Sequence, residues 1–278
     1  MSFKILKLVT QAILNLFMIL FSITCIFPLI WMLYSSLKTQ QEFSMDIISL
    51  PKVLHFDNFI AAIKIGKMHM FFGNSLFNSA VSVVLIIIIG FVVAYFLSRY
   101  NFKLRNLIYI VFLFGMLVPV HSLLIPLFIQ FKVLWLLDKR FTLILPYVAF
   151  GLPMAIFLFE SFIKSTPVEI EEAAYLDGSS TSTIIFKIVF PVCRPVISTI
   201  LILSFLNAWN EFPFALILLT KQSLKTLPIG LSNFNGAYTV NYPQLMAAMV
   251  IAILPVIVIY LLSSKRIIEG MTAGSVKG

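Results

Sequence analysis

Six long apolar segments, separated by short polar ones, dominate the hydrophobic pattern of this chain. They lie near residues 10–35, 74–98, 106–131, 142–163, 194–219 and 245–263. A helix needs about 20 residues to cross the hydrocarbon core of a bilayer, and each segment is long enough. The pattern therefore predicts an all-α integral membrane protein with six transmembrane helices. An even number of crossings places both termini on the same side of the membrane.

The first apolar segment begins like a secretory signal, because Lys4 and Lys7 precede an uncharged run. The run continues well past Cys25, through Pro28 and Trp31. That length exceeds the apolar region of a cleaved signal peptide. We interpret the segment as an uncleaved membrane anchor.

The composition supports a membrane location. Of the 278 residues, 60% are hydrophobic and 11% are charged, whereas about 25% of a typical soluble domain is charged. The formal net charge of +9 indicates contact with anionic lipid headgroups and basic cytoplasmic loops rather than nucleic acid. Two cysteines, Cys25 and Cys193, show neither a disulfide framework nor metal-ligand spacing.

One polar segment, residues 166–191, carries the most local structural information, and we name it the acidic hairpin. Its start, Thr166-Pro167-Val168-Glu169, has the form of a capping box. Gly178 predicts a left-handed residue that ends this first helix, and Ser179, Ser180 and Thr181 offer caps for a second one. The segment is predicted to form two short helices between membrane spans.

The first helix of the acidic hairpin is suited to docking against another surface. Ala173 and Ala174 are small enough to let a partner approach the backbone closely. Four acidic residues lie in this helix region with no basic residue among them: Glu169, Glu171, Glu172 and Asp177. Glu172 is expected to face the partner, and Glu171, further round the helix, is expected to matter less for docking if it points to water.

These residues resemble a known motif. Glu172, Ala173, Ala174, Gly178, Ile188 and Pro191 occur at the spacing of the EAA loop, which marks the membrane subunits of binding-protein-dependent ABC importers. The family pattern has Leu before the proline, and this chain has Phe190 instead.

The C-terminal sequence EGMTAGSVKG, residues 269–278, gives a second resemblance, to the tail of the sugar-transporting members of that family. It is similar to the smaller of the two maltose-type permeases. Further similarity at residues 36–39, 209–212 and 230–231 extends the resemblance over essentially the whole chain. In such tails the family inserts a Gly-rich segment between ATPase subunits, which implies ATPase contacts for Thr272, Ala273, Gly274 and Lys277.

The resemblance implies a type I ABC importer permease of the carbohydrate class, with one transmembrane permease domain over residues 1–278. Residues 166–191 would form the cytoplasmic coupling loop, and residues 265–278 a cytoplasmic C-terminal tail. The implied partners are a homologous second permease, a dimer of cytosolic ATPase subunits, an extracytoplasmic solute-binding protein and a sugar. No cofactor is expected in this chain, because ATP and Mg²⁺ would bind the ATPase. The implied location is a bacterial or archaeal cell membrane, with both termini cytoplasmic.

A polar cluster inside the fifth apolar segment is the other candidate site. Trp209, Asn210 and Glu211 precede Pro213, and an ionisable group at membrane depth marks a functional candidate. These three residues could line the translocation path. Glu211 could equally form a hydrogen-bonded bracket that holds a broken helix.

Two other classes of protein are weighed against the importer. A self-sufficient secondary transporter or channel would need no ATPase, but such transporters commonly show internal repeats, and the two halves of this chain show no convincing one. A membrane enzyme is disfavoured because the sequence contains no GxxxxGK[ST], GxSxG or HExxH motif. We therefore expect this subunit to be no enzyme.

Overall fold

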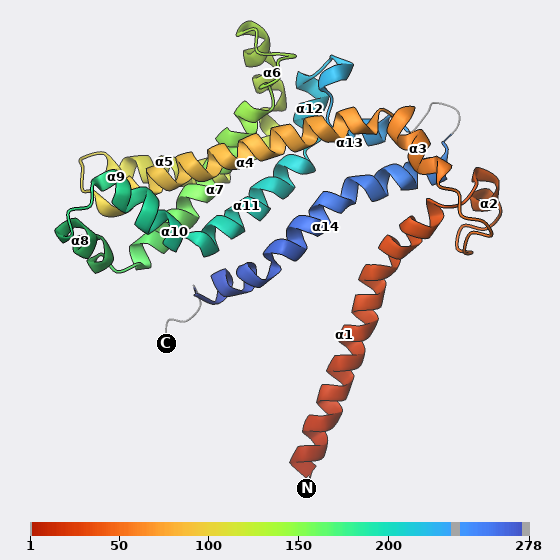
Figure 1. Cartoon of the computed structure of the whole chain (residues 1–278), viewed down its shortest axis with the longest axis horizontal. Coiled ribbons are helices and arrows are strands. Elements are labelled where there is room, and N and C mark those ends of the chain that lie inside the picture. The colour runs from red at the N-terminus through yellow and green to blue at the C-terminus, as the bar shows by residue number, and fades with distance from the viewer. Residues whose placement is uncertain (1, 235–239, 274–278) are drawn as a thin grey trace. The chain divides into compact units, whose positions relative to one another are not determined.

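A computed structural model describes the backbone of residues 2–234 and 240–273, and the side-chain surroundings of residues 7–262 within those ranges. The described chain is built from helices joined by short loops (Figure 1). The helices of the first half are α1 (Ser2–Ser35), α2 (Gln40–Met45), α3 (Asp57–Lys64), α4 (Met68–Arg99), α5 (Arg105–Leu117), η1 (Val120–Leu123) and α6 (Leu124–Val133). Those of the second half are α7 (Ile144–Ser165), α8 (Glu169–Leu176), α9 (Thr181–Thr183), the π-helix η2 (Ile184–Val189), α10 (Phe190–Val192), α11 (Arg194–Trp209), α12 (Pro213–Leu218), η3 (Gln222–Leu224), α13 (Leu227–Ser232) and α14 (Tyr242–Ala273).

Four helices of the described chain are continuous, long and apolar enough to cross a membrane: Lys7–Ser35, Met68–Arg99, Ile144–Ser165 and Tyr242–Leu262. Two further pairs qualify only as bent spans. Arg105–Leu117 meets Val120–Val133 at 91°, and Thr181–Val192 meets Arg194–Trp209 at 73°. The prediction of six spans therefore holds if each bent pair counts as one.

The predicted third span, 106–131, is wrong as one straight helix. Val118 adopts extended angles (φ −71°, ψ 122°) directly before Pro119, and proline disfavours the helical conformation of the residue preceding it. The helix therefore stops at Leu117, and the chain turns before α6 begins.

The predicted boundaries of the last two spans are also wrong. Instead of continuing to residue 219, α11 ends at Trp209, and Pro213 begins the separate short helix α12. The last helix, α14, continues to Ala273 rather than ending near residue 263. Hydropathy marks where the charge-free run meets Lys265 and Arg266, and a helix can continue beyond the end of its apolar run.

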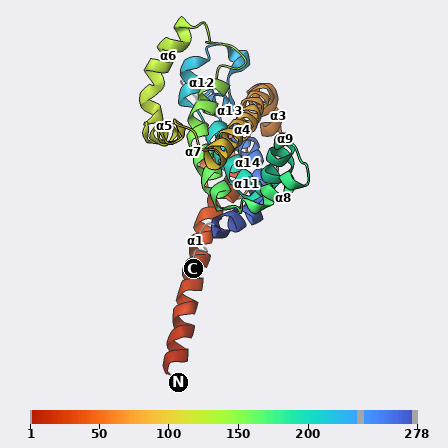
Figure 2. The same ribbon diagram turned by 90° about the vertical axis from the view of Figure 1, so that its left-hand side faces the viewer.

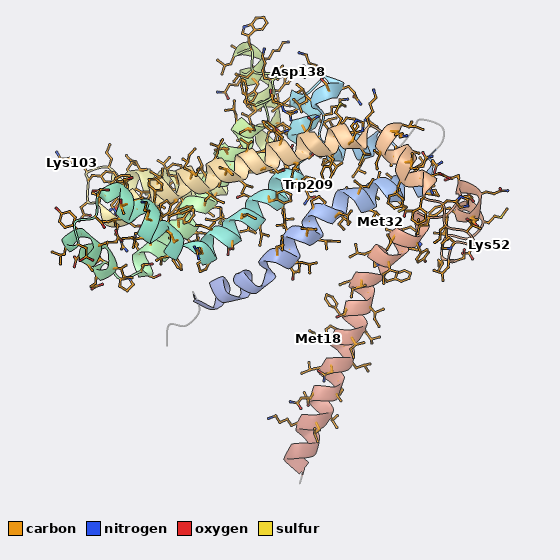
Figure 3. All side chains as sticks on the ribbon, viewed as in Figure 1. Met18, Met32, Lys52, Lys103, Asp138 and Trp209 are labelled. Atoms are coloured by element: carbon orange, nitrogen blue, oxygen red, sulfur yellow. The ribbon has the colours of Figure 1, made fainter. Side chains whose placement is uncertain are left out.

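The chain divides into two compact units, which we describe separately. Unit 1 comprises residues 1–68 and 231–254, and unit 2 comprises residues 69–230 and 255–278. Along α1 in unit 1, the side chains from residue 7 to residue 30 are exposed, and Figure 3 labels Met18 among them.

The loop after α2 in unit 1 is held through its backbone. Trp31 Nε1 donates to the carbonyl of Ile47 (3.0 Å), and the Tyr34 hydroxyl donates to that of Ile48 (2.7 Å). The ammonium of Lys38, which is fully buried, donates to the carbonyls of Asp46 (2.9 Å) and Ile47 (3.1 Å). Three side chains from the end of α1 and the residues just after it thus fix this loop.

Unit 2 contains the acidic hairpin at one end and the pair α6 and α12 at the other. Both views show α6 and α12 side by side (Figures 1 and 2). Their shared core includes Phe131, Phe214, Ala215 and Leu218, which are all buried. Figure 3 shows Asp138 at the α6 end and Lys103 at the hairpin end.

Helix α4 runs along unit 2 from beside α13 to the acidic hairpin (Figure 1). At its first turns, Asn74 donates to the carbonyls of Ser223 (2.9 Å) and Lys225 (2.9 Å) and accepts from Arg140. Further along, it packs tightly against α7. A Cβ at Gly90 would lie 3.0 Å from the Cβ of Ala155, so glycine permits this close approach.

Candidate functional site

The first helix of the acidic hairpin, α8, starts differently from the prediction. Thr166 ends α7, and its hydroxyl donates to the carbonyl of Phe162 (3.1 Å). Val168 is the N-cap of α8 and makes no side-chain capping bond. The predicted capping box is therefore wrong, because α8 begins only after Val168, which leaves Thr166 two residues before the N-cap, and the Thr166 hydroxyl serves the preceding helix.

The end of α8 follows the prediction. Gly178 has φ +80°, the left-handed conformation expected of a helix-terminating glycine. Its amide donates to the carbonyl of Tyr175 (3.0 Å), and the amide of Ser179 donates to that of Ala174 (3.0 Å). These two bonds form a Schellman motif, so the helix has a fixed end.

A buried ion pair attaches α8 to α4. Arg99 Nε donates to Glu171 Oε1 (2.6 Å), and a terminal nitrogen of Arg99 donates to the carbonyl of Thr166 (2.9 Å). The hydroxyl of Tyr95 donates to Glu171 Oε2 (2.7 Å). The condition that Glu171 points to water is not met, since only 9% of this residue is exposed.

Most of the remaining surface of α8 is open. Glu172 and Ala173 are exposed, while Ala174 is buried. Tyr175 and Leu176 expose 70% and 85% of their surface. A small residue, a carboxylate and two large apolar side chains together make a surface suited to docking on another protein.

The second leg of the acidic hairpin, residues 180–191, begins at a cap that the sequence predicted. Ser180 accepts from the amide of Thr183 (3.3 Å), and the π-helix η2 follows. Ile188 and Pro191 are half-buried in this leg. Phe190, the departure from the family pattern, packs edge-on against Phe91 of α4, with ring centroids 4.9 Å apart.

A cavity of about 600 Å³ opens in unit 2, between α4, α7, α11 and α12. Its polar lining groups come from Ser204, Asn207, Asn210, His121 and Glu211, and its apolar wall includes Ile86, Tyr147, Phe150 and Phe214. The volume is that of a small-molecule site. Sequence reasoning missed Asn207.

Glu211 braces the break between α11 and α12. Its carboxylate accepts from the hydroxyl of Tyr147 (2.8 Å) and from the amides of Phe214 (2.5 Å) and Ala215 (3.1 Å). The two amides are free donors at the start of α12, so the carboxylate acts as a cap. Glu211 thus holds the broken helix, as one of the two sequence interpretations proposed.

Trp209 and Asn210, the other two residues of the predicted polar cluster, have different surroundings from each other. Trp209 is buried in an aromatic cluster, where its ring stacks on Phe205 (centroids 5.3 Å apart) and meets Phe72 edge-on (5.4 Å). It is absent from the cavity lining. Asn210, the C-cap of α11, is exposed in the cavity.

The described residues hold no group of three or more His, Cys, Asp or Glu side chains that could bind a metal ion. The prediction that the tail residues contact an ATPase stays a prediction. The side chains of Thr272 and Ala273, and Gly274 and Lys277 entirely, lie outside the described residues.

Apolar helices long enough to cross a bilayer, an open cavity and a polar hairpin with an open docking face fit the class of multi-pass membrane permease subunits. The particular family follows from comparison: residues 86–271 match the model of the binding-protein-dependent transport system inner membrane component. The chain belongs to this family, so the resemblance noted in the sequence is confirmed.

Curated relatives are similar over nearly the whole chain. The arabinooligosaccharides transport system permease protein AraQ of Bacillus subtilis is 36% identical over 95% of this chain and 95% of its own length. The sulfoquinovosyl glycerol transport system permease protein SmoH of Agrobacterium fabrum is 37% identical over 91% of this chain and 89% of its own. Both are named as permease proteins of transport systems for carbohydrate compounds.

A solved structure shares the fold. A chain of a bacterial ABC transporter involved in the import of the acidic polysaccharide alginate superimposes with a TM-score of 0.81, over 95% of this chain and 97% of that one. Because the identity is 24%, this likeness shows the fold alone. The predicted type I importer permease fold is confirmed.

Proposed function

We propose that this chain is the permease subunit of an ATP-driven importer of sugars or oligosaccharides. Family membership, together with near full-length similarity to permeases named for oligosaccharide transport, carries the proposal. The chain would form the translocation path with a second, homologous permease. It would hydrolyse no ATP itself, since ATP and Mg²⁺ would bind a dimer of cytosolic ATPase subunits.

The acidic hairpin would be the element through which the ATPase acts. Its open face presents Glu172, Ala173 and Leu176 without covering contacts from the described chain. A docked ATPase would cover these side chains, and the closure of its two subunits on ATP would displace the hairpin. Alternating access to the path would follow from that displacement.

The cavity would form part of the sugar's path. Asn207, Asn210 and Ser204 offer neutral donors and acceptors to hydroxyl groups, and Phe150 offers an apolar surface. An extracytoplasmic solute-binding protein would deliver the sugar. This subunit would bind the sugar weakly, because a translocation path must also release it.

The orientation that we propose places both termini and the acidic hairpin in the cytoplasm of a bacterial or archaeal cell. Single cysteines at Ser180, on the hairpin, and at Ser44, on α2, test it, because both positions are exposed. An impermeant thiol reagent should label position 44 in intact cells and position 180 only in opened ones. Labelling of position 180 from outside would overturn the orientation.

Purification tests the function itself. The tagged chain, expressed with its neighbouring genes, should co-isolate an ATPase and a second permease, and the reconstituted complex should take up sugar only with ATP and a binding protein. A self-sufficient secondary transporter, the competing class, would isolate alone and transport without ATP. Uptake that ignores ATP would therefore refute the proposal.

A further inference from the structure

Helix α4 turns one face toward both legs of the acidic hairpin, the first leg being α8 and the second leg residues 180–191. Phe91, Tyr95 and Arg99 are spaced four residues apart, so their side chains lie in one row on the helix surface. Arg99 and Tyr95 bond Glu171 of the first leg, and Phe91 packs against the second leg. Yet α4 is distant from the hairpin in sequence.

The contact with the first leg is charged and buried. The side chains of Arg99 and Glu171 expose 13% and 10% of their surface. Because both oxygens of Glu171 are engaged, by Arg99 and by Tyr95, the carboxylate has no freedom to turn. Removing one partner would strand the other charge away from water, so α8 is held firmly against α4.

The contact with the second leg is aromatic. The ring of Phe91, fully buried, meets Phe190 edge-on at 73° and Phe186 at a centroid distance of 6.3 Å. It also meets Phe159 of α7 at 5.6 Å. The second leg therefore cannot shift without moving Phe91 or opening this packed cluster.

Helix α4 is also the stiffest route from the hairpin to the cavity. It has 32 residues and no proline, whereas α7 contains Pro153 and the chain bends by 73° between α10 and α11. Nine residues before Tyr95, Ile86 of α4 lines the cavity. Its side chain fills the notch at Gly151, where a Cβ would lie 2.4 Å from Ile86 Cδ1.

We propose that Arg99 and Glu171 are positioning residues that transmit the displacement of the acidic hairpin to α4, and through Ile86 to the cavity wall. The inference rests on the proposed function, since it assigns a route to the motion that the ATPase would drive. It separates two roles on α8: Glu172 on the open face docks, and Glu171 on the buried face transmits.

The experiment measures ATP hydrolysed per sugar transported, with the complete complex in proteoliposomes. Arg99→Ala and Glu171→Ala should each raise this ratio by roughly 2- to 30-fold, the range that residues on a coupling path reach, with the ATPase still bound. The double variant should raise it no further than either single one, because the pair acts as a unit.

Two milder variants guard against a loss of folding. Tyr95→Phe removes one hydrogen bond to Glu171 and should raise the ratio less, while Arg99→Lys keeps the charge and should partly restore coupling relative to Arg99→Ala. Lys164→Ala is the matched control, because Lys164 pairs with Glu160 of α7 and lies over the ring of Tyr109 of α5, contacts that do not join the acidic hairpin to α4, and its ratio should equal that of the wild type.

The outcomes separate the two proposals. If the wild-type chain isolates without an ATPase, the proposed function fails. If the ATPase is bound and the alanine variants keep the wild-type ratio, only this inference fails. If the alanine variants do not assemble and both Tyr95→Phe and Arg99→Lys couple normally, the ion pair is merely structural and the inference is overturned.

Discussion

Removing the carboxylate of Glu211 should lower the free energy of unfolding by more than most single substitutions do. Glu211→Ala would leave the amides of Phe214 and Ala215 without their acceptor, and the hydroxyl of Tyr147 without its partner. Loss of a helix cap costs about 0.5–2 kcal/mol, and a buried polar group left unpaired costs about 1–3 kcal/mol. The expected loss in the free energy of unfolding is therefore about 2–4 kcal/mol.

The assay is thermal unfolding of the purified complex in detergent. At about 2–4 °C per kcal/mol for a chain of this size, Glu211→Ala should lower the unfolding midpoint by roughly 5–15 °C. Glu211→Gln keeps one acceptor oxygen and should lose about half as much. Asn210→Ala is the control, since Asn210 is exposed, and it should shift the midpoint by about 2 °C or less. An unchanged midpoint in Glu211→Ala would refute the bracing role.

Three further predictions concern the acidic hairpin and the loop before α7. Gly178→Val should impair uptake more than Gly178→Asn, because a β-branched residue at φ +80° is strained by about 1–2 kcal/mol. Equal uptake by the two variants would argue against a conformational role. Glu172→Lys should abolish ATPase co-purification while the chain reaches the membrane at normal levels, and normal co-purification would disprove docking through this residue. Partial burial alone would raise the pKa of Asp138, but hydrogen bonds from Lys221 and Thr220 outweigh it and hold that pKa below its ordinary value. Because the folded state has the lower pKa, Asp138 should protect this loop from proteolysis above about pH 4. The protection should fade as the pH falls further, and Asp138→Asn should lack this pH dependence.

The apolar pattern predicted the spans but not their bends. Hydropathy records which residues prefer lipid, and it is blind to a change of direction inside an apolar segment. Pro119 and Pro213 were the available signals for the breaks near Val118 and after Trp209. Proline also occurs inside the continuous helix α7, so its presence alone does not locate a break.

Two identical local patterns show the limit of motif reading. Thr39 and Glu42 form a true capping box, with the amide of each bonded to the side chain of the other. Thr166 and Glu169 have the same spacing, but Thr166 bonds backward to α7. A threonine hydroxyl can accept from an amide of the following helix, as that of Thr39 does, or donate to a carbonyl of the preceding helix, as that of Thr166 does. The spacing of the two residues does not say which bond forms.

The candidate site divides in the same way. Gly178 and the cap at Ser180 depend on neighbouring residues and could be predicted. The partners of Glu171 are Tyr95 and Arg99, which lie in a different helix far away in the sequence, and no local pattern distinguishes Glu171 from Glu172. Tyr95 and Arg99, four residues apart at the end of α4, can be seen in the sequence. Their spacing does not indicate which acidic residue they bind.

The loop fixed by Trp31, Tyr34 and Lys38 has an evolutionary consequence. All three side chains bind main-chain carbonyls of residues 46–48, and every amino acid supplies such a carbonyl. Apart from Asp46, whose carboxylate accepts from the amides of Ile48 (2.9 Å) and Ser49 (3.1 Å), the path of this loop therefore depends little on the identity of its own side chains. Ile48, with 71% of its surface exposed, can be replaced by other residues while the backbone keeps its conformation. The loop can therefore change its surface chemistry without a change in its fold.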